Sequence, residues 1–144
     1  PVGVVAAIAP WNFPIVTPVR KIGPALAYGC TVVLKPANLT PWSAVRLMDV
    51  FRDAGIPKGV VNLVLGSGRG AGEALVRHPL VRGVSFTGST RTGADINAQL
   101  ARRFVRAQRV VRIAQAEPGQ RQLRIEADGA LVPSDRFLVA AKRC

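Results

Sequence analysis

The stretch that decides the fold is "VGVVAAIA" (residues 2–9), followed at once by "PWNFP" (residues 10–14). An uninterrupted apolar run of this kind is typical of a β-strand that is buried on both faces of a parallel sheet. The two prolines stiffen the loop that follows, because proline fixes its own φ and restricts the residue before it. Loops at strand ends often carry binding or catalytic groups, although Trp11 and Phe13 could equally cap a hydrophobic core.

The pattern of strand and then helix recurs along the first hundred residues. Three more buried strands are predicted, and they span residues 31–36, 59–66 and 83–88. Segments with a helical period follow the strands, and they span residues 16–28, 41–54, 71–78 and 89–107. Thr40 and Pro41 form a typical N-cap and first-turn pair for the second helix. About four such βα units predict a doubly wound, Rossmann-like parallel α/β sheet with right-handed crossovers.

Charge divides the chain into two parts. Its 144 residues are 49% hydrophobic, which is enough for one globular core, and the net charge is +12. Residues 1–100 hold 10 Lys and Arg against 4 Asp and Glu, and residues 101–144 hold the same numbers in less than half the length. We therefore expect an α/β domain over residues 1–108 and an irregular, basic tail over residues 109–144. Because aromatic residues are sparse in the tail, nucleic-acid binding is the weaker reading of its charge.

Other features of the chain point to a cytoplasmic fragment. No apolar run approaches the roughly 20 residues of a membrane span, and the N-terminus lacks the pattern of a secretory signal. Two cysteines, Cys30 and Cys144, give no disulfide framework, which fits a reducing compartment, and no metal site is expected. A chain that starts in a core strand without an initiator methionine is expected to be part of something longer.

The predicted strands end in polar, Gly-rich or aromatic residues, where doubly wound sheets bind ligands. "GSGRGA", which starts at Gly66, fits G-x-G-x-x-A, although a tight strand-to-helix turn explains it as well. Ser89 and Thr90 would lie at a helix N-terminus, a position that favours anions. Lys35 would place an ammonium group beside a ligand hydroxyl or phosphate, or would be a surface lysine with a buried stem.

Four ordered motifs resemble the aldehyde dehydrogenase superfamily, namely "APWNFP", "KIGPALAYGCTVVLKPA", "GVVNLVLGSG" and "VSFTGSTRTG". The resemblance runs from Val2 to about Gln108. It implies the NAD- or NADP-binding domain of an enzyme that oxidises a small-molecule aldehyde to a carboxylic acid through a cysteine thioester. It also implies that the intact enzyme is a homo-oligomer.

The resemblance gives individual residues a role. Asn12 would donate its side-chain N–H to the oxyanion that forms when a cysteine thiolate attacks the aldehyde, and such a donor must be preorganised. Lys35 and Asn38 would meet the adenosine ribose, and many NAD-preferring members carry Glu at the place of Asn38, so NADP should be tolerated. The full set expected around the cofactor is Trp11, Lys35, Asn38, Gly66, Phe86, Gly88 and Ser89.

The resemblance stops near residue 109. The family's general-base Glu, in an "LELGG" strand, is expected near position 110, where this chain has Val110. Residues 109–133 show no clear period, which favours a shifted reading frame or an artificial join over a divergent tail. Cys144, in "DRFLVAAKRC", is either the nucleophile or an ordinary cysteine. We expect this chain not to turn over aldehyde, and a non-catalytic dinucleotide-binding module is the alternative.

Overall fold

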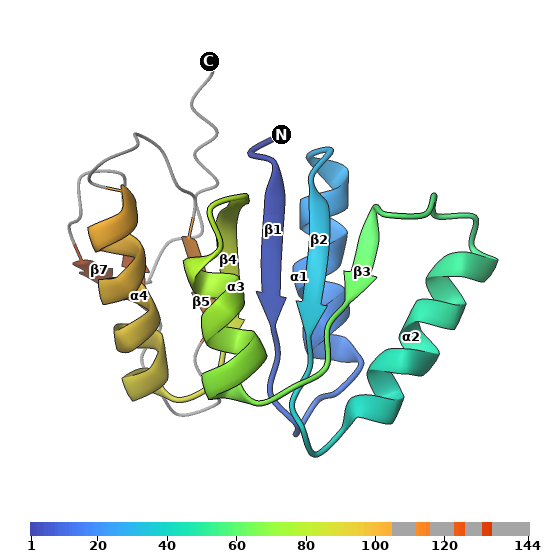
Figure 1. The fold of residues 1–144 in the computed structure, drawn as a ribbon, viewed down its shortest axis with the longest axis horizontal. Coiled ribbons are helices and arrows are strands. Elements are labelled where there is room, and N and C mark those ends of the chain that lie inside the picture. Colours follow the sequence, from blue (N-terminus) through green and yellow to red (C-terminus); the bar gives the residue numbers. More distant parts are fainter. Residues whose placement is uncertain (105–111, 116–122, 126–130, 134–144) are drawn as a thin grey trace.

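The computed structural model of the chain describes residues 1–104, 112–115, 123–125 and 131–133. Its centre is a five-stranded parallel sheet with the strand order β3-β2-β1-β4-β5 (Figure 1). The strands are β1 (Val4–Ile8), β2 (Thr31–Lys35), β3 (Val61–Leu63), β4 (Val81–Thr87) and β5 (Arg112–Gln115). The helices are α1 (Val16–Ala27), α2 (Pro41–Asp53), α3 (Glu73–Arg77) and α4 (Thr90–Phe104), with a π-helical turn η1 (Gly68–Gly72) before α3.

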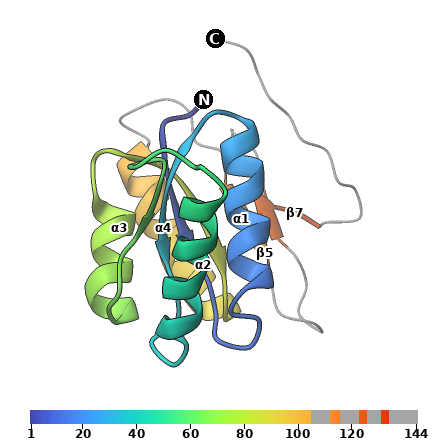
Figure 2. The same cartoon turned by 90° about the vertical axis from the view of Figure 1, so that its right-hand side faces the viewer.

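Helices cover both faces of the sheet (Figure 2). Successive side chains of a strand point to opposite faces, and β1 follows this rule. Ala7 and Ala9 belong to the core cluster shared with α1 and α2, whereas Ala6 and Ile8 belong to the cluster shared with α3 and α4. The apolar run of the opening stretch is therefore required, because neither face of β1 meets solvent.

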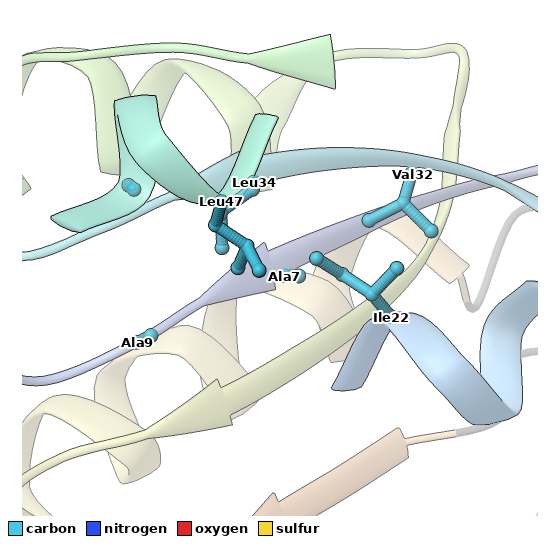
Figure 3. Close-up of a cluster of buried hydrophobic side chains, with 7 residues drawn as sticks. Ala7, Ala9, Ile22, Val32, Leu34 and Leu47 are labelled. Carbon is cyan, nitrogen blue, oxygen red and sulfur yellow. The ribbon is translucent and has the colours of Figure 1, made fainter. Parts of the chain in front are cut away.

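The core on the α1–α2 face combines small residues on β1 with larger ones around it. Figure 3 shows Ile22 of α1 and Leu47 of α2 beside Val32 and Leu34 of β2. Ile22, Val32 and Leu34 are fully buried, as is Ala7 of β1. The small side chain of Ala7 lets both helices approach the strand, which fixes the positions of the loops that lead into them.

The predicted elements of the first hundred residues are present, but β3 is shorter than expected. It spans three residues instead of the predicted 59–66. Gly59 has φ +85° and Gly66 has φ +147°, so the backbone leaves the extended conformation on both sides of the strand. The end of the predicted last helix, residues 105–107, lies outside the described residues.

Thr40 occupies the N-cap position of α2, and Pro41 opens the helix, as predicted. The expected capping hydrogen bond is nevertheless absent. The hydroxyl oxygen Oγ1 of Thr40 is buried and has no hydrogen-bond partner among the described residues. The position of the cap was therefore predicted correctly, but its mechanism was not.

Three short strands lie in the segment for which no regular structure was expected. β5 extends the sheet in parallel beside β4, with Val84 opposite Arg112. Two further strands, β6 (Leu123–Ile125) and β7 (Leu131–Pro133), pair antiparallel with each other. The rest of the predicted tail, including Cys144, lies outside the described residues. Within the described part of the chain, no helix is long and apolar enough to cross a membrane.

The strand order creates a switch point between β1 and β4. From β1 the chain moves outward through β2 and β3, and it then returns to the other side of β1 with β4. The connections on the two sides of this point cover opposite faces of the sheet. The carboxyl ends of β1 and β4 therefore flank the place where doubly wound sheets bind their ligands.

Candidate functional site

The carboxyl ends of β1, β2 and β4 bring the predicted site residues to one edge of the sheet. The parallel register places Ile8 at the end of β1 opposite Lys35 of β2 on one side and Phe86 of β4 on the other. The loop after Ile8 carries Trp11 and Asn12. In Figure 1 this edge lies at the bottom, opposite the N-terminus. Segments far apart in the sequence thus meet at one edge.

The loop between β1 and α1 exposes Trp11 and holds Asn12 half-buried. The side chain of Trp11 is 58% exposed, which leaves an indole face available at the edge of the sheet. The amide oxygen Oδ1 of Asn12 is buried and accepts no hydrogen bond from any described residue. Because no hydrogen bond joins the Asn12 amide to another described residue, its N–H donors can serve a ligand.

Lys35 ends β2 and is only 5% exposed. Burial lowers the pKa of its ammonium group. Among the described residues it has neither an ion-pair partner nor a hydrogen-bond acceptor. No described residue uses the Nζ donors of this largely buried side chain, so this position suits a ligand that brings oxygen acceptors. Asn38, three residues later, is exposed at the same edge.

The turn between β4 and α4 is compact because the ring of Phe86 packs against it. A Cβ atom on Gly88 would lie 2.5 Å from Cζ of Phe86, so a larger residue there would displace the ring. Oγ of Ser89 accepts a hydrogen bond from the backbone N–H of Thr92 at 3.3 Å, which makes Ser89 the cap of α4. Phe86 thus supports the turn, and Ser89 lies at the positive end of a long helix, where an anion is favoured.

Gly66 opens a second Gly-rich turn, and its conformation is also specific. With φ +147°, a Cβ atom at Gly66 would lie 2.8 Å from Cβ of Ala71. Oγ of Ser67 then accepts a hydrogen bond from the backbone N–H of Gly70 at 2.9 Å, at the start of η1. These contacts explain Gly66 and Gly70 of "GSGRGA" through the turn itself, without a bound ligand, whereas a Cβ atom on Gly68 would meet nothing within 4 Å.

The structure adds one buried cation that the sequence pattern did not single out. Nζ of Lys21 on α1 donates to Oγ1 of Thr87 at 2.6 Å and to Oγ of Ser85 at 3.5 Å. The residue is 5% exposed, and burial lowers its pKa to about 8. Because Thr87 directly precedes Gly88, Lys21 ties α1 to the β4–α4 turn. The sequence did hold one sign that Lys21 is buried. Lys21 lies beside Ile22, on the side of α1 that should be apolar.

Comparison with known proteins shows which family has this fold and these sequence motifs. A sequence profile of the aldehyde dehydrogenase family matches residues 1–111. The chain belongs to the aldehyde dehydrogenase family. It is 58% identical to phenylacetaldehyde dehydrogenase of Pseudomonas fluorescens over 102 residues. This aligned stretch covers 71% of this chain and 20% of that protein. It is 54% identical over 102 residues to the NADP⁺ succinate-semialdehyde dehydrogenase of Escherichia coli (strain K12), covering 71% of this chain and 21% of that protein.

Solved structures of aldehyde dehydrogenases share the fold. An NAD-dependent aldehyde dehydrogenase from Sinorhizobium meliloti matches with a TM-score of 0.71 and 44% identity, over 79% of this chain and 22% of that one. The NAD⁺ complex of an aldehyde dehydrogenase from Bacillus cereus matches with a TM-score of 0.72 and 49% identity, over 79% of this chain and 23% of that one. The chain thus spans about a fifth of the length of its aldehyde dehydrogenase relatives.

Lys21 should give the fold a pH dependence. Its pKa is about 8 in the folded chain, against 10.5 in the unfolded one, so between these values the unfolded chain binds more protons. The free energy of unfolding therefore rises with pH above about 8, by roughly 3 kcal/mol in total, whereas below pH 8 both states are protonated and this contribution is constant. In Lys21→Met the contribution of Lys21 is lost, so the rise becomes clearly smaller, as urea denaturation from pH 7.5 to 9.5 would show. A smaller rise remains, because burial also lowers the pKa of Lys35. Lys58→Met removes an exposed lysine and should keep the rise. Equal slopes in the two variants would contradict the assignment.

Proposed function

We propose that this chain is the cofactor-binding part of an aldehyde dehydrogenase that uses NAD or NADP to oxidise an aldehyde to a carboxylic acid. In this proposal residues 1–108 form the cofactor domain, and residues 109–144 form an atypical tail whose strand β5 joins the sheet of that domain. The observation that carries the proposal is Lys35 at the carboxyl edge of the sheet, whose Nζ donors no described residue uses, in a member of this family. The same edge holds Asn12, whose buried amide oxygen has no partner in the part of the chain that the structure describes. The fold and the site therefore support the same function.

The residues at this edge fit a dinucleotide. Lys35 has donors that no described residue uses, and they could serve the ribose hydroxyls. Asn38 would lie beside the same ribose. Gly88 and Ser89 would hold the pyrophosphate at the N-terminus of α4. Trp11 would line the path of the nicotinamide.

Two further residues would complete the cofactor site from its borders. The turn that begins at Gly66 would border the part of the site that holds the ribose. Phe86 would support the β4–α4 turn that binds the pyrophosphate, because its ring packs against Gly88. Lys21 would hold that turn in place through Thr87. When bound, the cofactor supplies the hydride acceptor for the oxidation.

The chemistry at the aldehyde would depend on Asn12. Its amide would donate to the oxyanion that develops when a cysteine thiolate attacks the carbonyl, and one such donor contributes about 10²–10³ in rate. Two prolines beside Asn12 preorganise the loop. Cys144 is the candidate nucleophile, and it lies outside the described residues. The aldehyde itself would be a small molecule, and the cell compartment we propose is the cytoplasm.

The first prediction concerns the choice of cofactor. Because Asn38 lacks a carboxylate, NADP⁺ should bind no more than about tenfold more weakly than NAD⁺, a gap of about 1.4 kcal/mol. Asn38→Glu should widen the preference for NAD⁺, since a carboxylate accepts from the ribose hydroxyls and repels a 2′-phosphate. Calorimetric titration of both cofactors measures the two affinities.

A control variant adds the same charge elsewhere. Leu80 is 68% exposed and precedes β4, at the opposite edge of the sheet. Leu80→Glu should leave the ratio of the two affinities unchanged. If Asn38→Glu weakened both cofactors equally, Asn38 would not lie near the 2′ position. If neither cofactor bound the parent chain, the proposed function would fail.

The second prediction is that the chain as given does not turn over aldehyde. Val110 stands where the family's general-base Glu is expected, so a thioester would have no positioned base to activate water. An assay that follows NADH absorbance with a panel of aldehydes should show no rate above the background without enzyme. Turnover that is abolished by Cys144→Ala or by Asn12→Ala would overturn this prediction.

A further inference from the structure

A hollow of about 240 Å³ lies between α3 and α4, away from the candidate cofactor site. It is lined by Val76, Arg77, Gln99, Arg102 and Arg103. These residues belong to the C-terminal parts of the two helices, which run back from the carboxyl edge of the sheet to its amino edge (Figure 1). The hollow is therefore separated from the turn at Gly88 and Ser89 by most of the length of α4.

The unused polar atoms around this hollow are donors. Nε of Arg77 donates to Oε1 of Gln99 at 3.3 Å, and its Nη2 pairs with Glu73. These contacts engage the amide oxygen of Gln99 and the carboxylate of Glu73, and no described residue accepts a hydrogen bond from the amide N–H₂ group of Gln99. Arg102 is exposed and has no ion-pair or hydrogen-bond partner among the described residues. A ligand that enters the hollow thus meets N–H groups.

Arg103 forms a fixed wall of the hollow. Its guanidinium donates to the carbonyl oxygens of Val76 at 2.7 Å, of Pro79 at 3.3 Å and of Val81. A side chain held by three carbonyls of the α3–β4 connection keeps its charge in one place. The pKa of Arg103 is lowered by burial and by the nearby charge of Arg82, so a further positive charge lies close to the hollow.

The balance of charge selects the ligand. The lining holds three arginines, and Glu73 is the one carboxylate paired with them in the described part of the chain, so the hollow carries a net positive charge. A phosphate group carries about −1.5 to −2 at pH 7 and offers three acceptor oxygens, and the arginine fork matches two of them. We propose that the hollow between α3 and α4 binds the phosphate group of a small molecule. This site is separate from the proposed dinucleotide site.

Inorganic phosphate is the first probe, with the complete 144-residue chain. Calorimetric titration at constant ionic strength keeps the screening of charges equal between samples. Arg102→Gln should weaken phosphate binding at least about tenfold, because charge-assisted hydrogen bonds are lost. Gln99→Leu removes a donor but no charge, and it should weaken binding about threefold or more. Lys58→Gln removes an exposed charge between α2 and β3 and should stay within about twofold of the parent chain.

Two further arms locate the site and its ligand. Saturating NAD⁺ should leave the affinity for phosphate unchanged, and Arg102→Gln should leave the affinity for NAD⁺ unchanged. If the hollow also contacts the part of the ligand beyond its phosphate group, glycerol 3-phosphate should bind more tightly than inorganic phosphate. Competition between phosphate and NAD⁺ would assign the phosphate to the cofactor turn and overturn the proposal. Absence of binding, or equal weakening by Arg102→Gln and Lys58→Gln, would overturn it as well.

Discussion

The rest of the structure depends on the parallel pairing of β1 with β2 on one side and with β4 on the other. This pairing aligns Ile8, Lys35 and Phe86 at one edge of the sheet, although they are far apart in the sequence. It holds only while both faces of β1 are covered, which the small residues Ala6 and Ala7 allow, because each is fully buried under a different pair of helices. The site residues at the carboxyl edge of the sheet are thus brought together by the packing of helices on both faces of β1.

Buried cations distinguish this edge from the rest of the core. Lys21 and Lys35 are each 5% exposed, and burial lowers the pKa of both. Neither forms an ion pair with a carboxylate among the described residues. Lys21 donates to the hydroxyls of Ser85 and Thr87, whereas no described residue accepts a hydrogen bond from Lys35. A ligand rich in oxygen acceptors would therefore find its partner at Lys35.

Sequence patterns predicted the parts of the structure that depend on local order. The strands follow from apolar runs, and the glycine at Gly88 follows from its motif, since its neighbour Phe86 is only two residues away. The contacts of Lys21 could not be predicted in this way, because Thr87 lies 66 positions along the chain. β5 was missed for a similar reason. Arg112–Gln115 has no apolar run, and its place in the sheet comes from backbone pairing with β4.

Most directly testable is our proposal that the carboxyl edge of the sheet binds the dinucleotide. Amide chemical shifts of the ¹⁵N-labelled chain, followed by NMR during titration with NAD⁺, test it. We predict saturable shifts at Trp11, Asn12, Lys35 and Ser89, with the C-terminal end of α4 unaffected. Shifts concentrated at the amino edge of the sheet, or no saturable shifts at all, would contradict it.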